Sequence, residues 1–303
     1  MSEGRPRVSI GLPVFNGERY LARALDSLIA QDFEDFELII SDNASTDSTA
    51  EICQDYARRD RRIKVHRNER NIGAVGNFNR TLDVASGAYF KWAAHDDWCA
   101  PEFLSRCVEV LDQDPNTVLC FTAMGVADGD GTVFRVQRED LDGATSSHPR
   151  TRFHTVLWHL VDCTSPVFGL MRRETLRRHG VVLPNVPELD RVLIGELSLL
   201  GRIRELHDVL FFHHGPPGHP KRDQWTWMDP ANAKRFRAAT VRITSHHATA
   251  LWGSSLSVVD KASLTMDLLA SFGVRRTLSK VRKLRKRRRK AAASGQTKGG
   301  STG

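Results

Sequence analysis

The chain has 303 residues, of which 40% are hydrophobic and 26% are charged, so it is long enough to bury a sizeable core. No run of 18 apolar residues occurs, and Met1 to Arg7 lacks the apolar stretch of a secretory signal, which argues against a membrane span or export. The five cysteines are scattered, without a C-x-x-C pair. This pattern argues against a disulfide framework or a zinc site and predicts reduced thiols in the cytoplasm.

The net charge of +8 is a local property of the chain. Residues 275–290 contain 11 Lys or Arg and no acid, and without them the net charge becomes −3. The part of the chain expected to be globular is therefore mildly acidic, and we expect no specific nucleic-acid partner.

Strand and helix patterns alternate over the first 125 residues. Apolar runs predict strands over 8–12, 36–40, 63–66, 88–93 and 118–122. Amphipathic runs predict helices over 16–30, 48–58, 73–85 and 101–111. We expect Asn16 to cap the first helix and a Ser48/Glu51 capping box to open the second. Strands separated by helices in this way indicate parallel β-α-β units.

The pattern changes after residue 126. A turn is expected over 128–131, helices over 152–162, 172–179 and 187–200, and strands over 202–205 and 209–212. Further helices are expected over 229–251 and 263–272, and the tail beyond 290 has a composition typical of disorder. We therefore divide the chain into two halves of one domain (1–125 and 126–222), a helical extension (223–274) and a basic tail (275–303).

Four polar clusters follow predicted strands or open a predicted helix, at 13–17, 41–47, 71–79 and 95–98. Each alone is also typical of an ordinary turn, helix cap or solvated loop. Together they lie where an open α/β sheet binds ligands, at the carboxyl ends of its strands. The adjacent acids Asp96 and Asp97 would repel each other unless a cation lay between them, and a divalent cation carrying a diphosphate supplies that charge. Asp42 offers an acceptor to a nucleobase, and Phe15 offers a flat apolar face.

These clusters resemble the motifs of the family 2 glycosyltransferases, which have the GT-A fold. The resemblance covers about 115 residues, Val8 to Thr122, and rests on five linked motifs in order: Pro13/Phe15/Asn16, Asp42/Ser45/Thr46/Asp47/Thr49, Asn71/Gly73/Asn79, Ala85/Gly87/Tyr89 and Asp96/Asp97. It implies a Rossmann-like α/β fold, with a mixed, mostly parallel sheet flanked by helices and a helical C-terminal extension. It also implies transfer of a sugar from a nucleoside diphosphate sugar to a hydroxyl of a glycan or lipid-linked acceptor, with inversion and with Mg²⁺ or Mn²⁺.

The resemblance also implies roles for individual residues. Asp97 would bind the metal, and the nucleotide would contact six residues: Pro13 and Phe15 in the base pocket, Asp42 at the base edge, Asp96 at the ribose, and Asn16 and Asn71. Two departures from the family pattern stand out, since Ala94 occupies the first position of the usual D-x-D-D motif and Asn43 replaces a second aspartate.

The resemblance further implies that the proton acceptor of an inverting transfer lies just before a helix in the second half. Asp190 is the candidate and Glu188 the reserve, and the alternative is that Asp190 only caps that helix. His213, His214 and His219 follow the last predicted strand. In some enzymes of the GT-A fold, which this chain resembles, a late histidine completes the metal shell or contacts phosphate, and a structural role is the alternative.

Other functions are considered for the same sequence. A nucleotidyltransferase would need a Gly-rich, Arg-containing loop where this chain has Pro13-Val14-Phe15-Asn16. A catalytically degenerate nucleotide-sugar-binding or scaffold protein is the alternative that Ala94 suggests. The basic segment 275–290 favours peripheral contact with an anionic membrane, on the inner face of the cell membrane. Nonspecific nucleic-acid contact or solubilisation are the alternatives for that segment.

Overall fold

The computed structural model describes residues 4–160, 165–186, 188–215 and 239–271. The described residues up to Leu256 form one compact unit, and the described residues from Ser257 to Ser271 belong to a second, with a helix over 258–271. Within these described residues, no helix combines the length and the apolar composition that crossing a bilayer requires.

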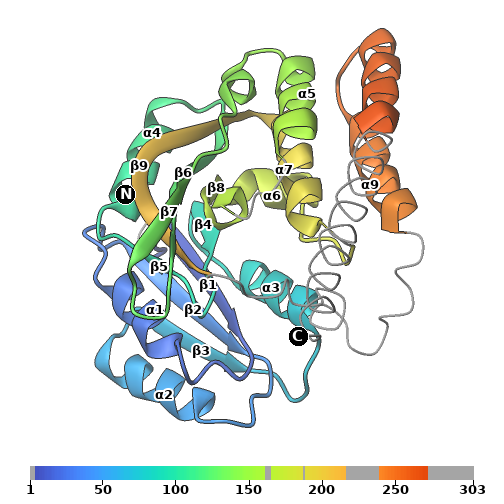
Figure 1. Ribbon diagram of the computed structural model, residues 1–303. Helices are drawn as coiled ribbons and strands as arrows, with labels where there is room; N and C mark the ends of the chain where they lie inside the picture. The colour runs from blue at the N-terminus through green and yellow to red at the C-terminus, as the bar shows by residue number, and fades with distance from the viewer. Residues whose placement is uncertain (1–3, 161–164, 187, 216–238, 272–303) are drawn as a thin grey trace, which may run out of the picture. The chain divides into compact units, whose positions relative to one another are not determined.

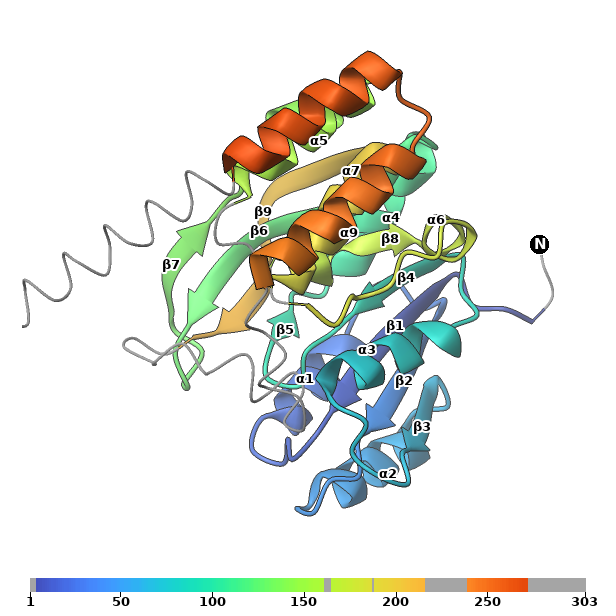
Figure 2. The same cartoon turned by 90° about the vertical axis from the view of Figure 1, so that its right-hand side faces the viewer.

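One mixed sheet organises the first unit (Figures 1 and 2). Its path runs β3-β2-β1-β4-β8-β6-β9-β5, and β7 pairs with β6 beside that path. Neighbours are parallel in the pairs β1–β2, β1–β4, β2–β3 and β6–β9, and antiparallel where β5, β7 and β8 take part. The strands are β1 (Val8–Val14), β2 (Phe36–Asp42), β3 (Ile63–Arg67), β4 (Tyr89–Trp92), β5 (Trp98–Cys99), β6 (Thr117–Ala127), β7 (Val133–Gln137), β8 (Leu170–Arg172) and β9 (Arg202–His214).

This pairing gives the sheet two chemically different edges. Because β8 is antiparallel to both β4 and β6, strands β1, β2, β3, β4, β6 and β9 all run in the same direction. Their carboxyl ends therefore meet at one edge of the sheet, which is where α/β folds bind ligands. Their amino ends and the carboxyl end of β8 lie at the opposite edge.

Helices cover both faces of the sheet (Figures 1 and 2). One buried apolar cluster joins α1, α2 and α4 to one face, and a second joins α3, α5, α6 and α7 to the other. Helix α9 packs on α7. The approach is close at Gly195 of α7, where an added Cβ would lie 2.5 Å from the His247 ring of α9. The helices are α1 (Leu21–Ile29), α2 (Thr49–Arg59), α3 (Ala74–Asp83), α4 (Phe103–Gln113), α5 (Pro149–His159), α6 (Arg173–Arg178), α7 (Leu189–Leu200) and α9 (Ala239–Gly253), with 3₁₀ turns at Asp142–Thr145 and Ser165–Phe168.

A buried carboxylate ties the amino ends of the central strands together. Glu37 of β2 accepts hydrogen bonds from Ser9, from Ser86 and from Lys64, whose Nζ lies 2.6 Å from Oε2. Burial opposes ionisation of Glu37, but these donors outweigh it and lower its pKa to about 2. Gly87 lies against this cluster, and a side chain there would collide with it, because a Cβ at this position would lie 2.7 Å from the Ser9 backbone nitrogen. Gly87 of the Ala85/Gly87/Tyr89 motif therefore has a packing role.

The predicted fold class and the strand–helix alternation of the first half are confirmed, as is the turn at 128–131 between β6 and β7. Asn16 as a helix cap is wrong: α1 begins at Leu21, and the Asn16 side chain instead accepts a hydrogen bond from Thr46 N–H. The Ser48/Glu51 capping box is also wrong, because Ser48 makes no side-chain cap and its N–H donates to Glu18.

The second half contains further differences. The two strands expected over 202–205 and 209–212 are one strand, β9, because its pairing with β6 continues through register shifts. The short strands β5 and β8 were not predicted. The helix expected over 229–251 is described only from Ala239, and the basic tail at 275–303 lies outside the described residues.

Candidate active site

The candidate site lies at the carboxyl edge of the sheet. Segments that follow β1, β2, β3 and β4 meet there with the end of β9. The loop after β1 carries Phe15, whose ring is 44% exposed and free to face a ligand. Pro13 lies in β1 beside Ser41 of β2.

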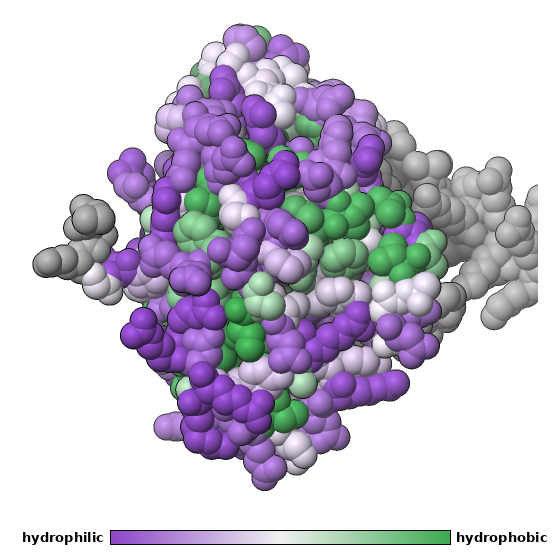
Figure 3. Space-filling model, turned by 90° about the vertical axis from the view of Figure 1, so that its left-hand side faces the viewer, coloured by the Kyte–Doolittle hydropathy of each residue, from purple (hydrophilic) through white to green (hydrophobic). Residues whose placement is uncertain are grey.

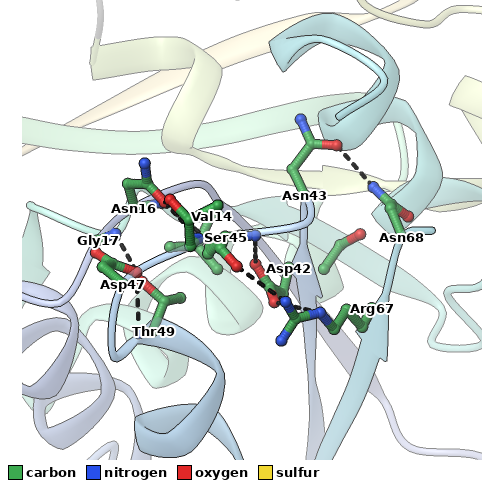
Figure 4. Close-up of polar contacts among 12 residues, drawn as sticks. Val14, Asn16, Gly17, Asp42, Asn43, Ser45, Asp47, Thr49, Arg67 and Asn68 are labelled. Carbon is green, nitrogen blue, oxygen red and sulfur yellow. Dashed lines mark hydrogen bonds and ion pairs between the residues drawn. The ribbon is translucent and has the colours of Figure 1, made fainter. Parts of the chain in front are cut away.

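Asp42 ends β2 and is only 1% exposed. Its Oδ1 accepts a hydrogen bond from Ser45 N–H at 3.0 Å, and its Oδ2 lies 3.5 Å from Nε of Arg67 (Figure 4). Arg67, which also donates to the Ser45 carbonyl at 2.9 Å, is half exposed. The sequence analysis missed Arg67, although it is a cation at the end of the strand paired with β2, in register with Asp42.

Reciprocal hydrogen bonds join the loop after β1 to the loop after β2 (Figure 4). We call this set the loop latch, and it comprises four contacts: Asn16 N–H to Ser45 Oγ (2.9 Å), Thr46 N–H to Asn16 Oδ1 (2.9 Å), Gly17 N–H to Thr49 Oγ1 (2.8 Å) and Glu18 N–H to Asp47 Oδ2 (3.2 Å). The Ser-Thr-Asp-x-Thr motif therefore holds two loops of the site in place.

Asparagines perform a similar task on the other side of Asp42. Asn43 Oδ1 accepts from Asn68 Nδ2 and from Ile72 N–H, both at 2.9 Å, and Asn43 Nδ2 donates to Asn71 Oδ1 at 2.9 Å. Asn71 Oδ1 also accepts from Gly73 N–H, where the backbone has a φ of 80° that favours glycine. Asn71 is thus engaged in shaping the loop that leads into α3.

The acid pair lies at the far side of the same edge. Asp97 is 5% exposed, and its Oδ1 lies 2.9 Å from His213 Nδ1 and 3.0 Å from the His214 backbone nitrogen. Burial and the charge of Asp97 raise the pKa of Asp96. Burial opposes protonation of His213, but Asp97 outweighs it and raises the pKa of His213. The two acids therefore repel each other, and Asp97 favours the protonated form of His213.

Aromatic contacts fix the acid pair against β9 and α1. Antiparallel pairing of β5 with β9 places Trp98 opposite Phe212, and their rings stack with centroids 5.5 Å apart. The Arg23 guanidinium of α1 lies 3.3 Å from the Trp98 ring centroid. Asp97 precedes Trp98 and His213 follows Phe212, so this stack places Asp97 beside His213.

The neighbours of the acid pair, His95 in the chain and His214 in β9, contact the segment after β1. A Cβ on Gly17 would lie 2.9 Å from the His95 ring, and the rings of Tyr20 and His214 lie 4.5 Å apart. The structure therefore brings the loop of Phe15, the Asp42 loop and the Asp96-Asp97 pair to one edge of the sheet.

The donor set can be tested against a divalent cation. Among the described residues, no three His, Cys, Asp or Glu side chains gather as a ligand group. Asp97 and His213 do meet, and Mg²⁺ often binds through one or two carboxylates while diphosphate oxygens and water complete its shell. The residues fit a cation that arrives with a diphosphate, and Ala94 accounts for the missing carboxylate.

Asp190 lies in the first turn of α7, two residues after Glu188, whose backbone has the left-handed φ of 52°. Burial raises the pKa of Asp190 to about 6. Its Oδ1 accepts from Arg191 N–H at 2.9 Å, and Glu188 forms an ion pair with Arg191 at 3.0 Å. In the described part of the chain, Asp190 has no hydrogen bond to the residues of the donor edge. Reciprocal bonds between Asn79 and the Leu183 backbone tie the segment before α7 to α3.

Comparison with known proteins identifies the family. The model of glycosyl transferase family 2 matches residues 9–180, more than half of the chain, and the chain belongs to this family. EpsH of Bacillus subtilis is 27% identical over 188 residues, covering 62% of this chain and 53% of EpsH. Protein Rv1520 of Mycobacterium tuberculosis is 39% identical over 120 residues, covering 39% of this chain and 35% of Rv1520. The matched part of this chain thus spans about half the length of EpsH and about a third of the length of Rv1520.

Solved structures share the fold. TarS 1-349 of Staphylococcus aureus, in complex with UDP-GlcNAc, superposes with a TM-score of 0.66 at 20% identity, over 88% of this chain and 72% of that one. The mannosyltransferase PcManGT of Pyrobaculum calidifontis, in complex with GDP-Man and Mn²⁺, gives 0.53 at 18% identity, over 89% and 81%. The curled, mostly parallel sheet flanked by helices is the GT-A fold.

Proposed function

We propose that the protein is a metal-dependent glycosyltransferase that moves a sugar, with inversion, from a nucleoside diphosphate sugar to a hydroxyl of a glycan or lipid-linked acceptor. The observation that carries this proposal is the convergence of Phe15, Asp42 and the Asp97–His213 pair at the carboxyl edge of one sheet. Two findings support it: the match of residues 9–180 to the family, and the shared fold of two solved complexes, one with UDP-GlcNAc and one with GDP-Man and Mn²⁺.

The donor nucleotide would lie along the latched loops. Phe15 offers its exposed ring to the base, next to Pro13. Asp42 is covered by Arg67, so the base would meet the Asp42–Arg67 pair together, one group accepting and the other donating hydrogen bonds. Asn16 and Asn71 contribute through the loops that their hydrogen bonds shape.

The diphosphate would lie at the acid pair. Asp97 would hold Mg²⁺ or Mn²⁺ together with His213, and Asp96 would bind the ribose. Such a cation, when bound, stabilises the negative charge that develops on the leaving diphosphate. The raised pKa of Asp96 supports this assignment, because burial and the neighbouring charge of Asp97 oppose its ionisation and a bound cation would relieve that repulsion.

Asp190 would take the proton of the acceptor hydroxyl, with Glu188 as the reserve. Its pKa of about 6 suits this task, since the carboxylate is then mostly ionised at neutral pH yet more basic than an exposed aspartate. Residues 1–125 would carry the donor side and 126–222 the acceptor side of one domain, followed by the helical extension at 223–274 and the basic tail.

The acceptor side has an apolar element near the acid pair. Strand β7 exposes Val133, Phe134 and Val136, and its partner β6 also pairs with the end of β9 that carries His213. Figure 3 views the side on which β7 lies in Figure 1 and shows apolar patches among hydrophilic side chains. A Campylobacter jejuni relative, 38% identical over 112 residues, is named as a GalNAc(5)-diNAcBac-PP-undecaprenol beta-1,3-glucosyltransferase. These points support a lipid-linked acceptor and a cytoplasmic protein peripheral to the inner membrane face.

A donor screen tests the proposal. The full chain is incubated with UDP-, GDP- and dTDP-sugars and Mn²⁺, and nucleotide release is measured. We expect release from one donor class, and loss of release in Asp97→Ala but not in Asp130→Ala, which changes an exposed aspartate of the β6–β7 turn. Metal-linked nucleotide binding without release from any donor would instead support a nucleotide-sugar-binding scaffold, which Ala94 makes the second candidate.

A further inference from the structure

A cavity of about 700 Å³ opens at the amino edge of the sheet, and arginines dominate its lining. Four of them, Arg172, Arg173, Arg177 and Arg178, line it together with Tyr89 and Glu174. Among its described lining residues the charge excess is three positive charges. The function proposed above makes no use of this cavity.

Two of the four guanidinium groups are held rigidly by backbone carbonyls. Arg172 donates to the carbonyls of Thr117 (2.8 Å), Leu111 and Asp114 (3.1 Å). Arg173 donates to three consecutive carbonyls, those of Ala85 (2.8 Å), Ser86 (2.9 Å) and Gly87. Carbonyl oxygens orient these groups and leave their full positive charge in place.

The remaining two arginines are exposed on α6. Arg178 pairs with Glu174 one helical turn away, whereas Arg177 has no carboxylate partner in the part of the chain that the structure describes. Burial, together with the positive charges of Arg177 and Arg5, lowers the pKa of Arg173. The carboxylate of Glu37 opposes this shift, and the effect of Arg177 shows that the positive charges lie close enough to act on one another.

The cavity is separate from the donor edge. It lies where β4 begins, at Gly87 to Tyr89, and where the antiparallel β8 ends, at Arg172. The acid pair follows the other end of β4, so the length of a strand separates the two sites. The diphosphate of a donor at the acid pair therefore cannot reach these arginines.

We propose that this cavity binds a phosphate-bearing anion, through Arg177 and Arg178 against the fixed charges of Arg172 and Arg173. The planar guanidinium fork matches phosphate oxygens in pairs, and an excess of three positive charges suits a multiply charged group such as a diphosphate. The phosphate belongs either to a free phosphorylated compound or to an anionic lipid headgroup, and the two arms of the test separate these sources.

The first arm uses inorganic pyrophosphate as the probe. Calorimetry on the full chain in EDTA, which removes metal-supported binding at the acid pair, compares the wild type with the double variant Arg177→Ala/Arg178→Ala. Arg58→Ala/Arg59→Ala is the matched control, because it removes the same two charges from the exposed end of α2. We expect the first double variant to weaken pyrophosphate binding by about tenfold or more and the control to bind like the wild type.

The second arm measures cosedimentation of the same three proteins with phosphatidylglycerol vesicles. A specific loss with Arg177→Ala/Arg178→Ala in the first arm assigns the site to free phosphorylated compounds, and a loss confined to the second arm assigns it to lipid headgroups. The proposal is overturned if the two double variants behave alike in both arms. Nucleoside diphosphate binding with Mn²⁺ should be unchanged in both double variants. Failure of the phosphate-site proposal would therefore not bear on the proposed glycosyl transfer.

Discussion

Asp97 and His213 lie 116 positions apart in the chain, yet their side chains meet at 2.9 Å. The two-residue strand β5 produces this contact, because its antiparallel pairing with β9 sets Trp98 against Phe212 and the next residues of each strand against each other. The contact joins the donor half of the fold to the strand that ends the second half.

His213→Ala should weaken Mn²⁺-supported nucleoside diphosphate binding by about 10- to 100-fold, because Asp97 loses a partner that orients it. The thermal midpoint should change little, since the His213 ring is partly exposed. Titration calorimetry with and without Mn²⁺ measures the effect. His207→Ala, at an exposed position of the same strand, is the control, and equal binding by the two variants would argue against a role for His213.

The pH dependence of transfer tests Asp190. A base must be ionised to act, and burial raises the pKa of Asp190 to about 6, so the rate should fall about tenfold per pH unit below that value. Asp190→Asn should lose about 10²- to 10⁴-fold in turnover at pH 7.5 while donor binding persists. Glu188→Gln should retain both the rate and the acid limb. The reverse pattern in the two variants would assign the base to Glu188.

The loop latch should contribute to stability as well as to the site. Thr49 is fully buried, and its hydroxyl accepts the Gly17 N–H at 2.8 Å. Thr49→Val keeps the shape but leaves that donor unpaired, which should lower the free energy of unfolding by about 1–3 kcal/mol. Urea unfolding measures this, with Thr151→Val at an exposed position of α5 as the control. No loss of stability in Thr49→Val would show that the latch contributes nothing there.

Glu37 should make stability depend on pH in the acid range. Its folded-state pKa of about 2 lies below the ordinary value of 4.5, so its contribution is complete above about pH 4.5 and disappears as the pH falls toward 2. Glu37→Gln should destabilise the protein by about 1–3 kcal/mol at pH 7, and the difference from the wild type should shrink near pH 2. Urea unfolding at several pH values, with the exposed Glu109→Gln as the control, measures this, and a difference independent of pH would contradict the assignment.

The sequence predicts the first half of this fold well because β1, β2 and β4 are buried, largely apolar runs and amphipathic helices separate the strands, whereas β3 is only partly buried. Strands β5 and β8, with two and three residues, are too short to carry a periodic signal and form only through their partners. The break expected within β9 reflects polar residues that the strand accommodates through register shifts against β6.

The sequence predicts the site residues that directly follow predicted strands. It does not predict the contacts that depend on which strands pair. Family motifs indicate Phe15, Asp42 and Asp97, and the parallel order of β1, β2 and β4 places their loops at one edge. Arg67 and the Asp97–His213 contact depend on which strands pair, and pairing is a property of the whole sheet. Asn16 shows the same limit, since its side chain is held by a loop that is distant in the sequence.

Nucleoside diphosphate binding to the wild type, Phe15→Ala and Asp97→Asn, measured by calorimetry with and without Mn²⁺, tests the central claim most directly. A single site formed by both residues predicts that Phe15→Ala weakens binding about tenfold while Mn²⁺ still strengthens it. It predicts that Asp97→Asn abolishes the effect of Mn²⁺. Wild-type affinity and wild-type Mn²⁺ dependence in both variants would contradict the claim that these residues share one donor site.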